Sequence, residues 1–249
     1  SFNPCSAEYV PPPPELVLEL VADLCDFCND DTLPAVAQAA IAHSQFETIH
    51  PFVDGNGRVG RALIHLVLRR RGVVSQVVPP VSLILATWAK EYVDALTGTR
   101  YRGPATSRAA QEGLNRWVGL FATATRRAIA DADAFEEKMQ LLEGIWRERL
   151  GQVRANSAVD LLLRRLPGAP ILTVQSAAEL IGRSTQATNE AITRLTEANV
   201  LSQTTAGRRN RAFESPEMIR AFTDLERQLA SPTGDTRTAP PTRRVPRRS

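Results

Sequence analysis

The sequence predicts a mainly α-helical protein with a smaller mixed α/β region towards its C-terminus. Apolar residues recur at helical spacing through most of the chain before Gln152, and short alternating runs of strand type occur only after it. Glycine and proline clusters fall between these segments. The chain has 249 residues, 43% of them hydrophobic and 23% charged, which is typical of a globular protein with one large or two smaller domains.

The first part of the chain is expected to form a helical bundle. A proline run, Pro11 to Pro14, precedes it, and Gly72 closes the third helix. The predicted helices cover residues 15–28, 34–49, 58–71, 87–96 and 107–150, the last one interrupted near 131–133.

Side chains expected to pack in the core of this bundle are Trp117, Trp146 and one stripe of the third helix, made of Val59, Leu63, Leu66 and Val67.

The pattern changes after Gln152. Helices are predicted over 159–166, 176–181 (with Ser176 as its cap), 185–198 and 216–229, together with a strand over 171–174. Two further alternating runs, 200–204 and 211–214, are joined by a basic tip. Helix, turn, helix and hairpin are the outline of a winged helix-turn-helix. We therefore predict domains at residues 1–151 and 152–230, followed by a disordered basic tail at 231–249.

Composition limits the partners and the compartment. The net charge of +3 does not by itself indicate a polyanion partner. The sequence contains three cysteines, and Cys25 and Cys28 form a CxxC pair that we interpret as two small core residues rather than a redox or metal site. Sparse cysteines fit a reducing, cytoplasmic setting. No apolar run reaches the ~20 residues of a membrane span, so no membrane association is expected.

The segment His50-Pro-Phe-Val-Asp-Gly-Asn-Gly-Arg-Val-Gly-Arg61 carries the chemistry. One helix ends at His50, and another begins just after a Gly-Asn-Gly turn whose N–H groups can cradle an anion at the start of a helix. Arg58 and Arg61 lie three residues apart on the new helix and can hold phosphate oxygens on one face. We therefore predict phosphate binding by Gly55, Asn56, Gly57, Arg58 and Arg61.

Two further side chains complete this arrangement. A carboxylate at Asp54 would repel phosphate unless it holds a divalent cation such as Mg²⁺. The ordinary pKa of histidine, about 6.5, suits His50 as a general base near neutral pH. Phe52 is expected to be buried and to pin the loop. A base, a metal-binding carboxylate and a phosphate-binding loop together predict transfer of a phosphorus group from a nucleotide to a hydroxyl group.

These twelve residues resemble the motif of the Fic (Fido) family, HxFxDGNGRxxR, at every fixed position. The resemblance covers roughly residues 1–150 and implies a protein adenylyltransferase, which moves AMP from ATP to a Ser, Thr or Tyr hydroxyl of a target protein or of itself. It implies His50 as the base, Asp54 as the Mg²⁺ ligand, and Gly55, Asn56 and Gly57 as the anion hole. Both glycines argue against the kinase-like Doc branch.

Two family elements are not visible in this sequence. The hairpin that aligns the target would precede Ser1, and the chain does not begin with Met, so we expect an N-terminal part outside it. No inhibitory helix motif is recognised either. The oligomeric state stays open, with a homodimer as one alternative.

A second hypothesis is a DNA-binding transcriptional regulator in which the Fic part is a nucleotide sensor or an inactive relic. It rests on polar and basic side chains of the predicted reading helix and wing, which are Thr185, Gln186, Asn189, Arg194, Arg208 and Arg209.

Overall fold

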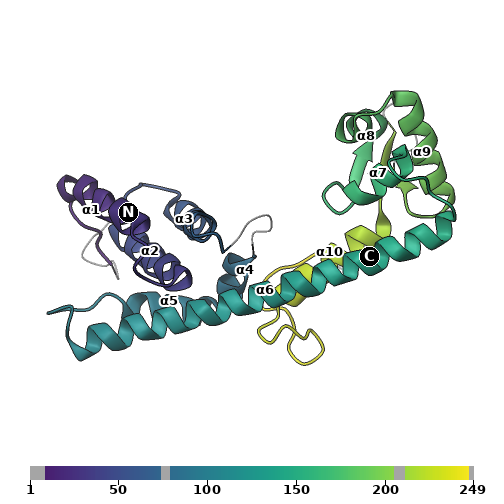
Figure 1. Ribbon diagram of the computed structural model, residues 1–249. Coiled ribbons are helices and arrows are strands. Elements are labelled where there is room, and N and C mark those ends of the chain that lie inside the picture. The colour runs from purple at the N-terminus through teal and green to yellow at the C-terminus, as the bar shows by residue number, and fades with distance from the viewer. Residues whose placement is uncertain (1–8, 74–78, 205–210, 247–249) are drawn as a thin grey trace. The chain divides into compact units, whose positions relative to one another are not determined.

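The computed structural model describes residues 9–73, 79–204 and 211–246, which form two compact units with their boundary between Ala130 and Asp131. The described chain is mainly helical, with one small three-stranded sheet in unit 2 (Figure 1). The predicted mainly α fold class is therefore confirmed. Within the described ranges, no helix is long and apolar enough to cross a membrane.

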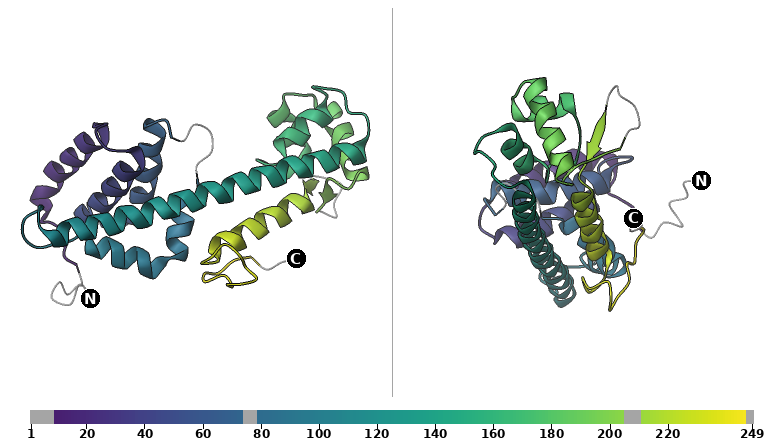
Figure 2. Two further views of the ribbon diagram at one scale, coloured as in Figure 1. Left: turned by 60° about the horizontal axis from the view of Figure 1, so that its bottom comes forward. Right: turned by 90° about the vertical axis from the view of Figure 1, so that its right-hand side faces the viewer.

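Unit 1 is built from helices alone as far as it is described. They are α1 (Pro14–Asn29), α2 (Ala35–Ile49), α3 (Asn56–Arg70), α4 (Val81–Thr87), α5 (Ala89–Gly98) and the first part of α6 (Arg108–Leu150). Helices α1, α2 and α3 lie side by side, and α5 runs along the first part of α6 (Figure 2). The helix expected over 87–96 corresponds to α5, and α4, which was not predicted, precedes it; the two meet at Trp88.

The core of unit 1 is centred on Trp117, as predicted. Its indole is fully buried and donates a hydrogen bond from Nε1 to Ala40 O at 2.7 Å, so α6 is tied to the middle of α2. The predicted core stripe of α3 is wrong for Val59 and Leu66, which are exposed. Val67 is buried as predicted, and Gly60, Ile64 and Leu68 face the core beside it, because Gly60 lets α3 approach polar side chains of α2 closely.

Helix α6 runs without interruption from Arg108 to Leu150, so the predicted break near residues 131–133 is wrong. A buried aspartate in a helix is unfavourable unless a partner satisfies it. Here Asp131 accepts a hydrogen bond from Gln228 Nε2 at 2.8 Å, within unit 2. That partner comes from a distant helix and was invisible to local sequence patterns.

Unit 2 combines the second part of α6 with α7 (Ala158–Arg165), α8 (Val174–Ile181), α9 (Thr185–Glu197), α10 (Pro216–Ala230) and three strands. The antiparallel sheet has the order β1 (Ile171–Thr173), β3 (Ala212–Glu214), β2 (Ser202–Gln203). In its register Leu172 pairs with Phe213, and both side chains enter the core. Helix α10 lies along α6 (Figure 2), where the rings of Phe135 and Phe222 are 5.0 Å apart.

Two details of the local predictions need correction. The cap of α8 is Thr173 and not Ser176; Ser176 is the N3 residue that completes the capping box. Cys28 is buried as expected, but Cys25 is exposed. Trp146 is buried as predicted, and its Nε1 donates to Glu217 Oε2 at 2.6 Å.

Candidate active site

The candidate base, His50, is the residue that ends α2. Its N–H donates to Phe46 O at 2.9 Å, and its backbone adopts the left-handed conformation, with φ 50° and ψ 56°. Proline at the next position disfavours continuation of the helix. A left-handed conformation is costly for a residue other than glycine and persists only where the surroundings impose it. The turn leaves the His50 side chain exposed at the carboxyl end of α2.

The loop after His50 is closed by Asn56. Its buried amide donates from Nδ2 to Phe52 O at 2.5 Å and accepts from Phe52 N at 3.0 Å. The expectation that a buried Phe52 ring pins the loop is wrong, because that side chain is 49% exposed. The ring lies 6.2 Å from that of Phe46. One side-chain amide satisfies both backbone groups of Phe52, so the loop is fixed by polar bonds rather than by burial of an aromatic ring.

The amino end of α3 has free backbone donors. Gly55 is its N-cap in the left-handed conformation, with φ 91°, and its carbonyl accepts the N–H groups of Arg58 and Val59, both at 3.0 Å. The N–H groups of Asn56 and Gly57 have no hydrogen-bond partner within the described chain. Orphan N–H groups and the helix dipole favour an anion at this end. The arrangement suits the predicted phosphate cradle.

Asp54 and Arg58 are paired at the surface. Asp54 Oδ2 lies 3.1 Å from Arg58 Nη2, and these side chains are 91% and 74% exposed. Asp54 Oδ1 also accepts the N–H of Gly55 at 2.7 Å. Exposed ion pairs contribute little to stability, so either partner can be exchanged for a ligand at low cost.

No cluster of three or more metal-ligating side chains occurs among the residues that the structure describes. Asp54 is therefore a single carboxylate and not part of a protein-only metal cage. Such a carboxylate still fits Mg²⁺, which is often bound through one or two carboxylates together with substrate phosphates and water. Asp54 would hold the ion only together with a nucleotide.

Arg61 lies over the free donors of α3. Its Nη1 atom is 3.1 Å from the position that a Cβ atom would take on Gly57. A side chain at position 57 would therefore displace the guanidinium group. The Arg61 guanidinium group has no hydrogen bond or ion pair in the described part of the chain, which leaves its nitrogen atoms available to phosphate oxygens.

A buried polar layer lies beneath this surface. His43 Nε2 and Tyr92 Oη are 2.8 Å apart, and burial lowers the pKa of His43 to about 4. Burial also raises the pKa of Glu47, and the nearby charges of His50, Arg61 and Arg100 offset only part of this rise. The side chains of His43 and Glu47, both on α2, face Gly60, where a Cβ atom would lie 2.5 Å from Glu47 Oε1. The one signal in the sequence was a glycine inside a helix, which usually has a packing reason.

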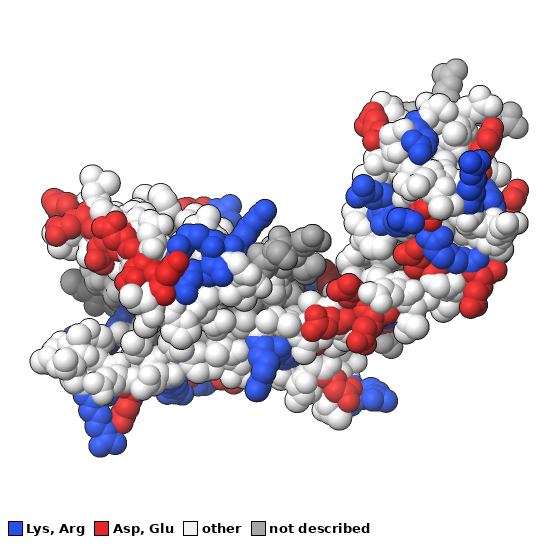
Figure 3. Space-filling view, viewed as in Figure 1, with Lys and Arg blue, Asp and Glu red and all other residues white. Residues whose placement is uncertain are grey.

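Charge on the surface of unit 1 is segregated. On the face seen in Figure 3, acidic side chains gather over α1 and basic side chains over the neighbouring α3. An anionic ligand would therefore be attracted to α3 and repelled by α1.

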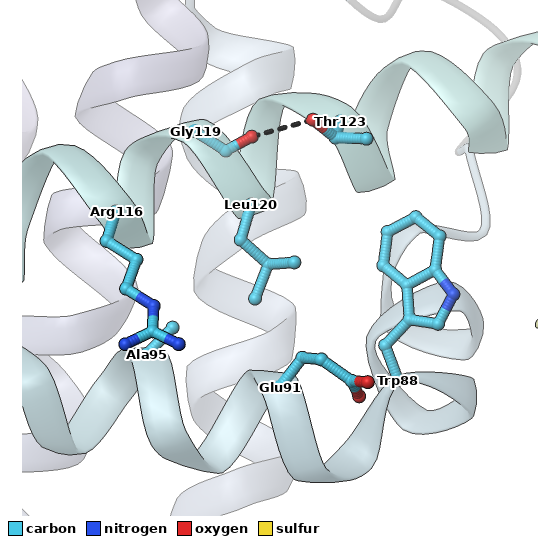
Figure 4. A pocket seen from close by; sticks show the side chains of 7 residues that line it. All are labelled: Trp88, Glu91, Ala95, Arg116, Gly119, Leu120 and Thr123. Atoms are coloured by element: carbon cyan, nitrogen blue, oxygen red, sulfur yellow. Dashed lines mark hydrogen bonds between the residues drawn. The ribbon is translucent and has the colours of Figure 1, made fainter.

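A separate pocket of about 470 Å³ lies between α5 and α6 (Figure 4). Leu120 and Ala95 form apolar parts of its wall, with Glu91 and Arg116 beside them. None of the residues that line it belongs to the motif, so the candidate active site is a surface formed by the ends of two helices and not this cavity.

The residues predicted for DNA contact fall into three groups. Thr185, Gln186 and Asn189 line an open groove of about 850 Å³ together with Arg211, whose Nη2 donates to Asn189 Oδ1 at 2.6 Å. Arg194 is turned away from that groove and donates to the carbonyls of Leu150 and Gln152 at 2.9 and 2.8 Å. Arg208 and Arg209 lie outside the described residues.

Comparison with known proteins connects the motif to a family. Residues 3–68 match the family model of the Fic/DOC family. The chain is 33% identical over 133 residues to the protein adenylyltransferase fic-1 of Caenorhabditis briggsae, covering 49% of this chain and 24% of that protein. It is 41% identical over 70 residues to a probable protein adenylyltransferase of Aquifex aeolicus, covering 28% of this chain and 22% of the relative.

A crystal structure of a Fic family protein from Desulfovibrio desulfuricans aligns with 84% of this chain and 58% of its own, at 23% sequence identity and a TM-score of 0.40. The chain spans about a quarter of the length of the curated relatives named above. Its first part, which contains the motif, is thus similar to the Fic/DOC family and to proteins named protein adenylyltransferases.

Proposed function

We propose that this chain is a protein adenylyltransferase that transfers AMP from ATP to a Ser, Thr or Tyr hydroxyl of a target protein or of itself. The observation that carries the proposal is the juxtaposition of an exposed histidine at the end of α2 with the free N–H groups at the start of α3. Similarity to named adenylyltransferases supports AMP as the transferred group.

In this reaction His50 takes the proton of the target hydroxyl as its oxygen attacks the α-phosphorus. The bond from the α-phosphorus to the bridging oxygen breaks, and pyrophosphate leaves. The N–H groups of Asn56 and Gly57 stabilise charge on the phosphate oxygens, and Arg58 and Arg61 hold the remaining phosphates. Gly55 supplies the turn that aims these donors.

Asp54 would hold Mg²⁺ with the nucleotide. The ion, when bound, would neutralise phosphate charge. Because Asp54 and Arg58 form an exposed pair, Arg58 is free to move to phosphate when the carboxylate is engaged. We place the reaction in the cytoplasm, because sparse cysteines suit a reducing compartment.

The test compares ATP labelled at the α-phosphate with ATP labelled at the γ-phosphate, in the presence of Mg²⁺. AMP transfer labels protein only from the first. His50→Ala should reduce the rate by about 10²- to 10⁴-fold, the usual contribution of a general base. His65→Ala, which changes a half-buried histidine of α3 outside the motif, serves as the control. Label that persists in His50→Ala, or that comes from the γ-phosphate, would refute the proposal.

A second candidate function is nucleic-acid binding by unit 2, as a winged helix-turn-helix. The order α7, β1, α8, α9, β2, β3 agrees with that motif, and α9 presents Thr185, Gln186 and Asn189 to an open groove. The polar lining of this groove is the observation that favours DNA.

Binding of the full chain to duplex DNA should weaken as salt rises, with a linear slope of log affinity against log salt concentration. Gln186→Ala with Asn189→Ala should reduce affinity, whereas Gln140→Ala, at an exposed position of α6, should not. Binding that is absent or insensitive to salt would argue against this candidate.

A further inference from the structure

The carboxyl end of α2 is held by side chains from two distant segments. A helix leaves its last carbonyls without intrahelical partners. In α2, Tyr9 Oη donates to Thr48 O, and Arg100 Nη2 donates to Glu47 O at 3.5 Å. Tyr9 precedes α1, and Arg100 follows α5. Two successive carbonyls just before the candidate base are therefore bonded to residues 39 and 53 positions away.

Tyr9 and Arg100 also bind each other. The guanidinium carbon of Arg100 lies 3.6 Å from the centre of the Tyr9 ring, which is close for a cation–π contact. Burial raises the pKa of Tyr9, with Arg100 opposing it, so the hydroxyl group keeps its proton and remains a donor at neutral pH. A cation at the carboxyl end of a helix is also favoured by the helix dipole. We call this pair the Tyr9–Arg100 clamp.

The position that follows the clamped carbonyls is strained. His50 adopts the left-handed conformation and is joined to α2 by its N–H bond to Phe46 O. A strained backbone of this kind is maintained by the structure around it. Loss of the clamp would let the last turn of α2 open and allow His50 to relax to other conformations.

We propose that Tyr9 and Arg100 are positioning residues that hold the end of α2 so that His50 stays in place for proton transfer. The catalytic consequence rests on the proposed function, because it requires His50 to act as the base. The clamp's hydrogen bonds to α2 are made to carbonyl groups, whereas the nucleotide donors lie on α3 and are held by Gly55 and Asn56. The clamp should therefore affect turnover and leave ATP binding unchanged.

Steady-state AMP transfer in Tyr9→Phe and Arg100→Gln separates these effects. Tyr9→Phe removes one hydroxyl and keeps the ring beneath Arg100. We expect kcat to fall about fivefold in Tyr9→Phe and about tenfold in Arg100→Gln, the range for loss of one or two hydrogen bonds. KM for ATP should stay within about twofold, since only the position of His50 changes. Arg100→Lys, which keeps the charge, should recover part of kcat.

Neighbouring residues provide matched controls. Tyr101→Phe and Arg102→Gln make the same chemical changes at exposed positions one or two residues away, and neither should alter kcat. An unchanged kcat in both clamp variants would overturn the proposal. So would a joint change of kcat and KM with a lower melting temperature, because that pattern indicates general loosening of unit 1.

Hydrogen exchange of the His50 amide gives a readout that does not need activity. Its N–H bond to Phe46 O should open more often in both clamp variants and not in the two controls. If the wild-type chain transfers no AMP, the proposed function fails. The hydrogen-exchange rate of the His50 amide then tests by itself whether Tyr9 and Arg100 hold the end of α2. Faster exchange would then support the structural clamp, and unchanged exchange would overturn it.

Discussion

Two aspartates of this protein are paired with arginine in opposite surroundings. In unit 1, the Asp54 side chain is 91% exposed and meets Arg58 at 3.1 Å. In unit 2, the Asp160 side chain is only 2% exposed and accepts hydrogen bonds from Arg147 at 2.7 Å and from the N–H of Asn156 at 2.9 Å, and it forms an ion pair with Arg164 at 3.1 Å. These bonds hold the pKa of Asp160 below its usual range, the hydrogen bond from Arg147 first among them.

The difference distinguishes a charged pair that is available to a ligand from a charged pair that stabilises the fold. An exposed pair contributes roughly 0–1 kcal/mol and can be exchanged for a ligand. A buried carboxylate with several donors cannot leave them without exposing unpaired charges, which is strongly destabilising. The same residue types therefore predict ligand binding at the start of α3 and stability between α6 and α7.

The largest expected effect comes from removing each carboxylate in turn. Asp160→Ala should lower the free energy of unfolding of unit 2 by about 1.5–3 kcal/mol, because it removes the charged acceptor of the hydrogen bonds from Arg147 and from the N–H of Asn156. Asp54→Ala should change stability by less than about 1 kcal/mol but reduce AMP transfer on the order of 100-fold. Urea unfolding and transfer assays on both variants measure the contrast.

The contrast would be lost if Asp54→Ala destabilised the protein as much as Asp160→Ala. It would also be lost if Asp54→Ala kept full transfer activity.

The stability of the two units should also depend differently on pH in the acidic range. His43 of unit 1 has a pKa of about 4 because it is buried, whereas the unfolded chain binds this proton near the ordinary value of about 6.5. The unfolded state therefore gains protons first, and stability present above pH 6.5 is lost as the pH falls towards 4, by about 3 kcal/mol. Asp160 has a lowered pKa, so its contribution is present above the unfolded value of about 4 and is lost only below it.

Pulse proteolysis in urea at pH 7, 6 and 5, with peptides assigned to each unit, measures this difference. Burial raises the pKa of Glu47, which changes stability in the opposite direction, so wild type is compared with His43→Gln. The variant should lose the dependence on pH that is due to His43. Equal acid sensitivity of wild type and variant would show that His43 does not titrate as described.

The smallest expected effect concerns two helical glycines. In unit 1, a Cβ atom on Gly60 would lie 2.5 Å from Glu47 Oε1, so Gly60→Ala should cost about 1–3 kcal/mol through overpacking. In unit 2, no atom lies within 4 Å of a Cβ atom on Gly144, so Gly144→Ala should stabilise by about 0.5–1 kcal/mol through helix propensity. Thermal unfolding of both variants measures the pair, and a destabilised Gly144→Ala would contradict the assignment of open space there.

Local patterns were sufficient to locate the first three helices and to propose the chemistry of the motif. Periodic apolar residues located α1, α2 and α3, and the residue types from His50 to Arg61 indicated a phosphate cradle before any geometry was known. These features depend on neighbours within one or two helical turns. The domain boundary at residue 151 stays a prediction. The compact units of the structure have their boundary between Ala130 and Asp131.

Features that join distant segments required the tertiary structure. Asp131 stays within a continuous α6 because Gln228, 97 residues away, satisfies it. Burial also required the structure, since the Phe52 ring is half exposed and the buried amide of Asn56 closes the loop. Tyr9, before α1, and Arg100, after α5, meet at the end of α2 from distant segments of unit 1. By itself the sequence located the first helices and named the side chains that we propose bind phosphate and accept a proton. Only the packing of helices decided which of them are exposed, which are paired and what holds His50 in place, because burial and hydrogen bonding depend on contacts that sequence spacing does not encode.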